Sequence, residues 1–263
     1  MERYKAIVAY DGTDFAGFQV QAGEPTVQAV LEDALGGLGW SGKHLLAAGR
    51  TDSGVHALGQ VVAFDLHWPH PPEALREALN ARLPGSVRCR EVERSTLDFH
   101  PRYSALWRTY RYRLMESRMA NPLAERFAWR VWPALQRDDL AEVTALIVGL
   151  KDFGAFGTAP KRGGTTLRHV LRAEWREAEE AFEFTIQANA YLYRMVRMLV
   201  GSLVRVGQGR LTPGEFAGLL DEPKERSGGP AAPARGLCLT KIDYDAPDET
   251  DGRPPLAGAI SET

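Results

Sequence analysis

The chain has 263 residues, 44% of them hydrophobic and 25% charged, a composition typical of a globular protein with an ordinary core. No apolar run approaches the roughly 20 residues that a membrane-spanning helix needs, and the first residues enter a strand-like run directly, so neither a membrane protein nor a secreted one is expected. Cys89 and Cys238 lie far apart without partners at metal-ligand spacing, which predicts no metal site, no disulfide and a cytoplasmic location.

Charge is distributed unevenly along the chain. The net charge is only −2, yet 26 of the 32 basic residues are Arg. Ten Arg and five acidic residues lie between Arg88 and Arg130, and residues 184–214 contain four Arg and no acid, whereas 243–262 hold six acids and one Arg. Such segregation allows a nearly neutral protein to carry a cationic face for a nucleic acid. Genome composition or thermostability explains the total number of Arg equally well, but not their clustering.

Strands and helices alternate in the first half. Helices are indicated by apolar residues at helical spacing and strands by short apolar or alternating runs. In chain order we expect a strand at 5–10, a Gly-rich loop at 11–21, a helix at 26–36, strands at 45–48 and 60–66, a helix at 72–83 and a strand at 87–93.

The second half repeats this order of elements. We expect a strand at 107–115, a helix at 137–150, a basic loop at 154–166, strands at 169–176 and 182–188, helices at 191–206 and 212–220 and a closing strand at 237–244. This order of strands and helices predicts an α+β fold of two ferredoxin-like halves, with antiparallel sheets joined into one extended sheet and helices on one face. The expected domains are 1–104 and 105–245, followed by a loosely ordered acidic tail, 246–263.

A short loop between the strands at 45–48 and 60–66 carries a candidate catalytic carboxylate. Gly49 and Gly54 permit a tight turn and close approach of a ligand to the backbone around Asp52. A carboxylate beside Arg50 stays ionised, and it can act as a nucleophile or stabilise positive charge at a glycosidic carbon. Spacing alone nevertheless favours the plainer interpretation, in which Asp52 caps a turn.

The segment from Gly49 to Val61, GRTDSGVHALGQV, resembles the signature of the tRNA pseudouridine synthase A family. Ser53 stands where Ala is common in that family, Phe18 where Trp is common and Tyr191 where Phe is common, and none of these changes removes a group that the reaction needs. Eight ordered blocks extend the resemblance over nearly the whole chain: 10–21, 25–32, 80–84, 98–105, 108–112, 151–156, 189–197 and 232–237.

The resemblance implies an isomerase that converts uridine to pseudouridine at nucleotides 38, 39 and 40 of the tRNA anticodon arm. It further implies a homodimer that needs neither cofactor nor metal. By the same resemblance Asp52 is the nucleophile, attacking the ribose C1′ or the uracil C6. Tyr110 matches the family's active-site aromatic residue, which stacks on uracil and handles protons. Arg197 matches the basic residue that pairs with the catalytic Asp.

The residues themselves leave alternatives open. Tyr110 also fits an aromatic residue packed in the core, and Arg197 fits a solvated Arg stripe on a helix. Because a glycine inside a helix costs roughly 1 kcal/mol, Gly201 on the same helical side as Arg197 indicates close packing there. The planar guanidinium of Arg50 suits two roles: it can orient Asp52, or it can bind a phosphate. His56 is expected to be an ordinary hydrogen-bonded histidine outside catalysis.

A uridine in a stem must be flipped out to reach such a carboxylate, and basic side chains would hold the neighbouring phosphates.

Rival hypotheses are a non-catalytic RNA-binding module, a pseudouridine synthase with another RNA target and, more weakly, a glycosidase with paired carboxylates. In the expected geometry, the Asp52 loop faces the helix of Arg197 across a cationic cleft between the halves. The candidate RNA-binding residues, chosen for local basicity, are Arg102, Arg108, Arg111, Lys161, Arg162 and Arg168.

Overall fold

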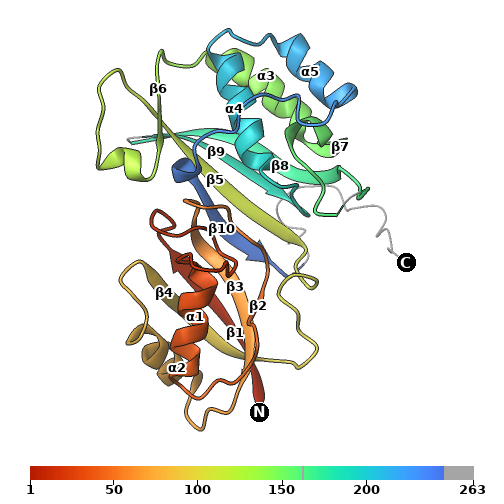
Figure 1. The fold of residues 1–263 in the computed structure, drawn as a ribbon. Coiled ribbons are helices and arrows are strands. Elements are labelled where there is room, and N and C mark those ends of the chain that lie inside the picture. The colour runs from red at the N-terminus through yellow and green to blue at the C-terminus, as the bar shows by residue number, and fades with distance from the viewer. Residues whose placement is uncertain (162, 180, 246–263) are drawn as a thin grey trace.

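The computed structural model describes residues 1–161, 163–179 and 181–245, so Arg162 and the expected acidic tail, 246–263, lie outside the described residues. Ten strands form one sheet in the order β4-β1-β3-β10-β5-β9-β8-β7, with β2 beside β3 and β6 beside β5 (Figure 1). The strands are β1 (Glu2–Tyr10), β2 (Leu46–Ala47), β3 (His56–Leu66), β4 (Val87–Ser95), β5 (Trp107–Glu116), β6 (Trp129–Val131), β7 (Gly149–Asp152), β8 (Leu167–Ala178), β9 (Ala181–Ala188) and β10 (Leu237–Asp243).

Five α-helices accompany this sheet in the described part of the chain. They are α1 (Val27–Gly36), α2 (Pro72–Asn80), α3 (Arg137–Ile147), α4 (Met195–Gly207) and α5 (Pro213–Asp221). Short 3₁₀ turns occur at η1 (Ala124–Arg126), η2 (Gly154–Phe156) and η3 (Ala234–Gly236). None of the described helices has the length and apolar character needed to cross a membrane.

The same topology occurs twice in the chain. The elements β1-α1-β2-β3-α2-β4 place their strands in the order β4-β1-β3-β2, and β5-α3-β8-β9-α4-β10 place theirs in the order β10-β5-β9-β8. Both are the ferredoxin-like βαββαβ arrangement, which confirms the expected α+β class. The two halves join where β10 runs parallel to β3, through the pairs Cys238–His56 and Leu239–Ala57.

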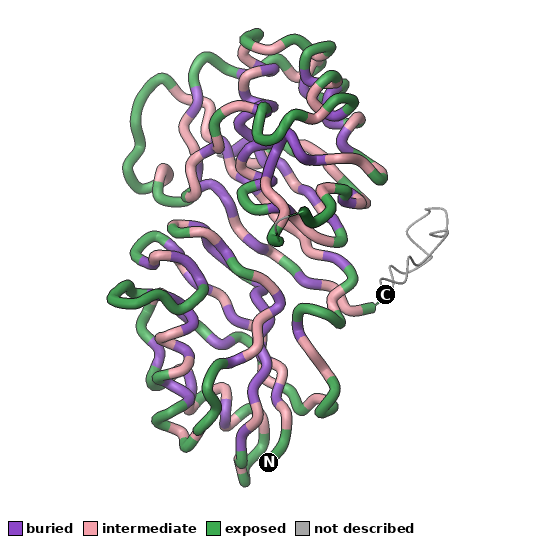
Figure 2. Tube along the Cα trace, turned by 45° about the vertical axis from the view of Figure 1, so that its right-hand side comes forward, coloured by how far each residue is buried: buried purple, intermediate pink, exposed green. Residues whose placement is uncertain are grey.

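Strand alternation directs the apolar side chains to the helical face of the sheet. In β1 every second residue from Tyr4 to Tyr10 is buried, and in β9 Phe182, Phe184 and Ile186 are buried. These side chains belong to two hydrophobic clusters, one in each half, and the ring of Tyr110 packs against both. Figure 2 shows the buried residues along the central strands and the exposed ones mainly in the outer loops.

Two helices differ from the expected boundaries in ways that affect the site. Helix α3 ends at Ile147 instead of 150, because Gly149 adopts φ +102° and starts β7. Helix α4 begins at Met195 instead of 191, because Arg194 has a left-handed φ of 63° and Tyr193 pairs with Thr158. Arg197 therefore lies in the first turn of α4, where its side chain projects toward the junction of the halves.

Gly201 of α4 packs directly against the segment that leads to β10. A Cβ added at Gly201 would lie 2.1 Å from the carbonyl oxygen of Pro230, so the close packing indicated by this helical glycine is present. We expect Gly201→Ala to lower the free energy of unfolding by about 1–3 kcal/mol, because the crossing backbone must shift. Denaturant titration measures this. Gly218→Ala in α5 is the matched control, since no described atom lies within 4 Å of its added Cβ; equal losses for both variants would contradict the tight contact.

Candidate active site

The loop that carries Asp52 is fastened to the Gly-rich loop that follows β1. The amide of Phe18 donates to the carbonyl of Thr51 at 3.1 Å, and the amide of Gly54 donates to the carbonyl of Phe15 at 3.3 Å. The hydroxyl of Ser53 donates to the same Phe15 oxygen at 3.2 Å. The backbone on both sides of Asp52 is thus held by a neighbouring loop rather than left free in solvent.

Glycines permit the two loops to approach this closely. A Cβ at Gly12 would lie 2.0 Å from the carbonyl oxygen of Val55, and one at Gly17, where φ is +109°, would lie 2.9 Å from that of Thr51. Below them the hydroxyls of Tyr10 and Thr51 share a buried hydrogen bond of 2.8 Å. The Gly-rich loop predicted at 11–21 therefore has a structural task, which is to fix the backbone that presents Asp52.

Asp52 meets Arg197 at the junction of the two halves. Nη1 of Arg197 donates to Oδ2 of Asp52 at 3.0 Å, and the two side chains are 16% and 23% exposed. Nε of Arg197 donates to the carbonyl of Ala232 at 2.8 Å, which fixes the guanidinium from a second side. The two residues that the sequence pairs are thus in direct contact, although 145 positions separate them.

Tyr110 lies beside this pair on β5. Its ring meets that of Tyr191 edge-on, with centroids 5.0 Å apart, and the Tyr191 hydroxyl donates to the carbonyls of Arg108 and Ile186 at 2.9 and 3.0 Å. Burial and then the negative charge of Asp52 raise the pKa of Tyr110 well above its usual range. The phenol is therefore neutral, and it is suited to donate or relay a proton.

The arrangement presents one carboxylate oxygen to a ligand. Oδ2 of Asp52 is taken by Arg197, while Oδ1 receives no hydrogen bond from any described residue. The fixed guanidinium and the rigid backbone thus leave a positioned carboxylate with one oxygen free of described partners, an arrangement that can serve nucleophilic chemistry. No group of three His, Cys, Asp or Glu side chains suited to a metal occurs in the described ranges.

Comparison with known proteins shows the family to which the chain belongs. The family model described as tRNA pseudouridine synthase matches residues 6–104 and 143–245. The chain belongs to this family. Its members are isomerases. Two proteins named tRNA pseudouridine synthase A are each 37% identical: that of Syntrophotalea carbinolica, over 96% of this chain and 100% of its own, and that of Geobacter sulfurreducens, over 93% and 100%. A chain of a Cbf5–Nop10–Gar1 complex aligns with TM-score 0.38 and 15% identity over 76% of this chain and 45% of that one.

Three of the basic residues selected from the sequence have polar partners within the protein. Arg108 donates to the carbonyls of Arg102, Ala105 and Asn189, and burial lowers its pKa. Arg111 follows Tyr110 in the strand and so points to the opposite face of the sheet, where Glu183 lies 3.7 Å away. Arg168 is buried and donates to the carbonyls of Thr165 and Leu167.

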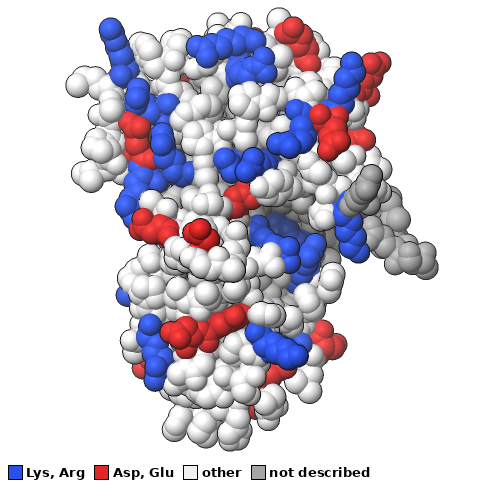
Figure 3. All heavy atoms as spheres, in the orientation of Figure 1, with Lys and Arg blue, Asp and Glu red and all other residues white. Residues whose placement is uncertain are grey.

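The other described candidates for RNA binding are exposed at the surface of the enzyme. Arg50, Arg102 and Lys161 are exposed, and the Arg50 guanidinium forms no hydrogen bond or ion pair with any described residue. Figure 3 shows Lys and Arg side chains around a hollow between the upper and lower halves of the molecule. A group of cationic side chains therefore lies between the two halves.

Sequence reasoning left two contributors to the site without a role. Tyr191 belongs to a recognised motif block, and its partly buried ring lies against that of Tyr110, the candidate active-site aromatic residue. Ala232 acts through its backbone carbonyl, for which side-chain patterns give no signal. His56 is hydrogen-bonded on both ring nitrogens, as expected of a histidine outside the chemical step.

Proposed function

We propose that this enzyme converts uridine to pseudouridine at nucleotides 38, 39 and 40 of the tRNA anticodon arm, with Asp52 as the nucleophile. The observation that carries the proposal is the 3.0 Å contact between Asp52 and Arg197, in a chain of the tRNA pseudouridine synthase family. The names of the relatives support tRNA as the substrate.

In the proposed reaction the target uridine leaves the helical stack and enters the site between the halves. Asp52 attacks the ribose C1′ or the uracil C6, the bond between N1 and C1′ breaks, the base turns, and C5 bonds to C1′. The bond to Asp52 breaks again, either when C5 displaces the carboxylate from C1′ or when the carboxylate is eliminated from C6, so Asp52 is regenerated. The proton lost from C5 is balanced by one gained at N1, so the product is an isomer. Tyr110 supports the base and relays a proton, and Arg197 orients Asp52 through the 3.0 Å hydrogen bond.

The proposal includes contacts outside the reacting base. Arg50 orients Asp52 or holds a phosphate, since its exposed guanidinium is free of described partners. Arg102 and Lys161 are exposed candidates for phosphate contacts. Arg108, Arg111 and Arg168 act indirectly in this view, through the segments that they hold. A cytoplasmic homodimer completes the proposal, on the strength of the motif resemblance.

Mapping of the product tests the choice of substrate. We expect the purified enzyme to release tritium from C5-labelled tRNA transcripts with uridine at 38, 39 and 40, and the new pseudouridines to map to those nucleotides. The matched control is a transcript with cytidine at these three positions and uridine retained elsewhere, which should release no tritium. Release from the control would indicate a synthase with another target. Binding without release from either transcript would favour the non-catalytic RNA-binding module.

A further inference from the structure

One segment of the chain connects the helix of Arg197 to the loop of Asp52. Residues 230–236, which we call the crossing segment, follow α5 in the chain, pack against α4 at Gly201 and lead into β10. At Ala232 the segment exchanges two hydrogen bonds with Arg197, one to its guanidinium at 2.8 Å and one between the backbones at 2.9 Å. Farther along, Ala234 packs on the Asp52 loop, because a Cβ at Gly54 would lie 3.2 Å from the methyl group of Ala234. The position of Arg197 thus depends on this segment.

His56 fastens the crossing segment to the N-terminal half. The amide of Gly12 donates to Nδ1 at 3.0 Å, which places the ring proton on Nε2, and Nε2 donates to the carbonyl of Arg235 at 3.1 Å. Asp11 lies 3.2 Å from Nδ1 and favours a second proton, but burial dominates and lowers the pKa of His56. The neutral imidazole therefore joins three segments: the Gly-rich loop, β3 and the crossing segment.

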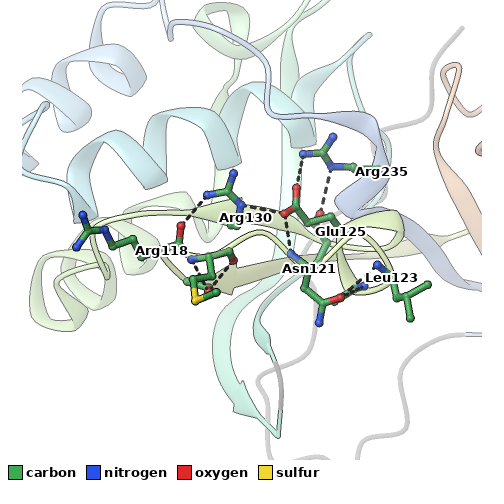
Figure 4. A network of polar contacts seen from close by, with 10 residues as sticks. Arg118, Asn121, Leu123, Glu125, Arg130 and Arg235 are labelled. Carbon is green, nitrogen blue, oxygen red and sulfur yellow. Dashed lines mark hydrogen bonds and ion pairs between the residues drawn. The ribbon is translucent and has the colours of Figure 1, made fainter.

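The opposite side of the crossing segment is held by the arm between β5 and β6. In Figure 4, Glu125 lies between two guanidinium groups, with Arg130 at 2.9 Å and Arg235 at 3.6 Å. The next residues of the arm reach the N-terminal half, where Arg126 pairs with Asp11 at 2.8 Å and the ring of Phe127 lies 5.0 Å from that of His56. His56 thus contacts the Gly-rich loop, the crossing segment and the arm between β5 and β6.

We propose that His56 is a positioning residue for the Asp52 site: by holding the carbonyl of Arg235 it sets the crossing segment, and through Ala232 it holds the Arg197 guanidinium on Asp52. The backbone junction of the two halves is short, because β10 pairs with β3 through only two residue pairs. The hydrogen bond from His56 to Arg235 lies beside that junction and therefore helps to fix how the two halves are positioned. The inference rests on the proposed function for its catalytic readout, but its structural readout is independent of it.

Two variants of His56 separate positioning from general stability. His56→Phe fills the space without either hydrogen bond, and His56→Gln retains an amide nitrogen that can donate to Arg235. We expect kcat of the Phe variant to fall about 10- to 100-fold, the effect of displacing a reacting group by up to 1 Å. KM for tRNA should stay within about twofold, since the residue does not touch RNA. The Gln variant should recover most of kcat. All rates are measured where circular dichroism shows each variant fully folded.

Tyr112→Phe supplies an independent perturbation of the same segment, because the Tyr112 hydroxyl donates to the carbonyl of Pro233 at 2.7 Å. If both residues act through the crossing segment, the double variant should lose less than the product of the single losses. Hydrogen exchange at 230–236 should accelerate in His56→Phe and not in His56→Gln, whether or not the protein modifies tRNA. Unchanged exchange and unchanged kcat in folded His56→Phe would overturn the proposal, and so would a Gln variant as impaired as the Phe variant. Absence of turnover in the wild type, with exchange as expected, would contradict the proposed function alone.

Discussion

The Asp52→Asn variant is expected to bind tRNA as the wild type does and to form pseudouridine at least about 10⁴-fold more slowly. The amide has the size of the carboxylate, and its oxygen can still accept the 3.0 Å hydrogen bond from Arg197. The loop is held by backbone bonds to Phe15 and Phe18 that do not involve the Asp52 side chain. What the variant lacks is negative charge, without which the side chain is no nucleophile. Single-turnover tritium release with saturating enzyme isolates this step.

A matched control removes a carboxylate elsewhere in the same half. Asp33→Asn lies on the exposed side of α1, and we expect it to retain wild-type turnover and tRNA affinity. If Asp52→Asn turned over at the wild-type rate, the nucleophile assignment would be wrong, and the structural role of a turn-capping Asp would remain. If instead the variant lost tRNA binding, Asp52 would act in recognition before chemistry.

Local patterns in the sequence were sufficient to predict most of the fold. Buried β1 and β9 and the helices α1 and α3 follow from their alternating or helical apolar residues, and these patterns reflect local burial. The start of α4 was wrong by four residues because a left-handed Arg194 interrupts an otherwise helical apolar pattern. Strands β6 and β7 were not expected; β7 begins at Gly149, inside the range assigned to the preceding helix.

The site could be predicted only in part, for a different physical reason. Asp52 and Arg197 meet because β10, the last strand in the chain, lies between β3 and β5 and joins the two halves, and no local pattern encodes that pairing. The motif blocks indicated both residues, but the carbonyl of Ala232 that orients Arg197 has no sequence signature. In contrast, the period of two in β5 already indicated that Tyr110 and Arg111 point to opposite faces.

Arg197 provides the second large effect that we expect. Arg197→Lys keeps the positive charge but cannot donate from two separate nitrogens to Asp52 and Ala232 at once, because an ammonium is a single point of charge on a flexible stem. Arg197→Ala removes the charge as well and leaves the half-buried Asp52 without its partner. Loss of one preorganised donor at a reacting group typically lowers kcat by about 10²–10³-fold. We therefore expect such a loss for Ala and a smaller one for Lys, both measured as single-turnover rates.

Arg205→Lys is the control on the same helix. It lies eight residues beyond Arg197, about 12 Å along the axis, on the same side of α4 and near Gly229 instead of Asp52. If Arg197 acted merely as part of a phosphate-binding stripe, changes at 197 and 205 would weaken tRNA binding to a similar degree, and both effects would diminish at high salt. If Arg197 acts on the carboxylate, its loss lowers kcat with little change in KM, and salt does not mask it because the pair is largely shielded from solvent. The ratio of the two effects on kcat therefore decides between a stripe that holds RNA and a guanidinium that serves Asp52.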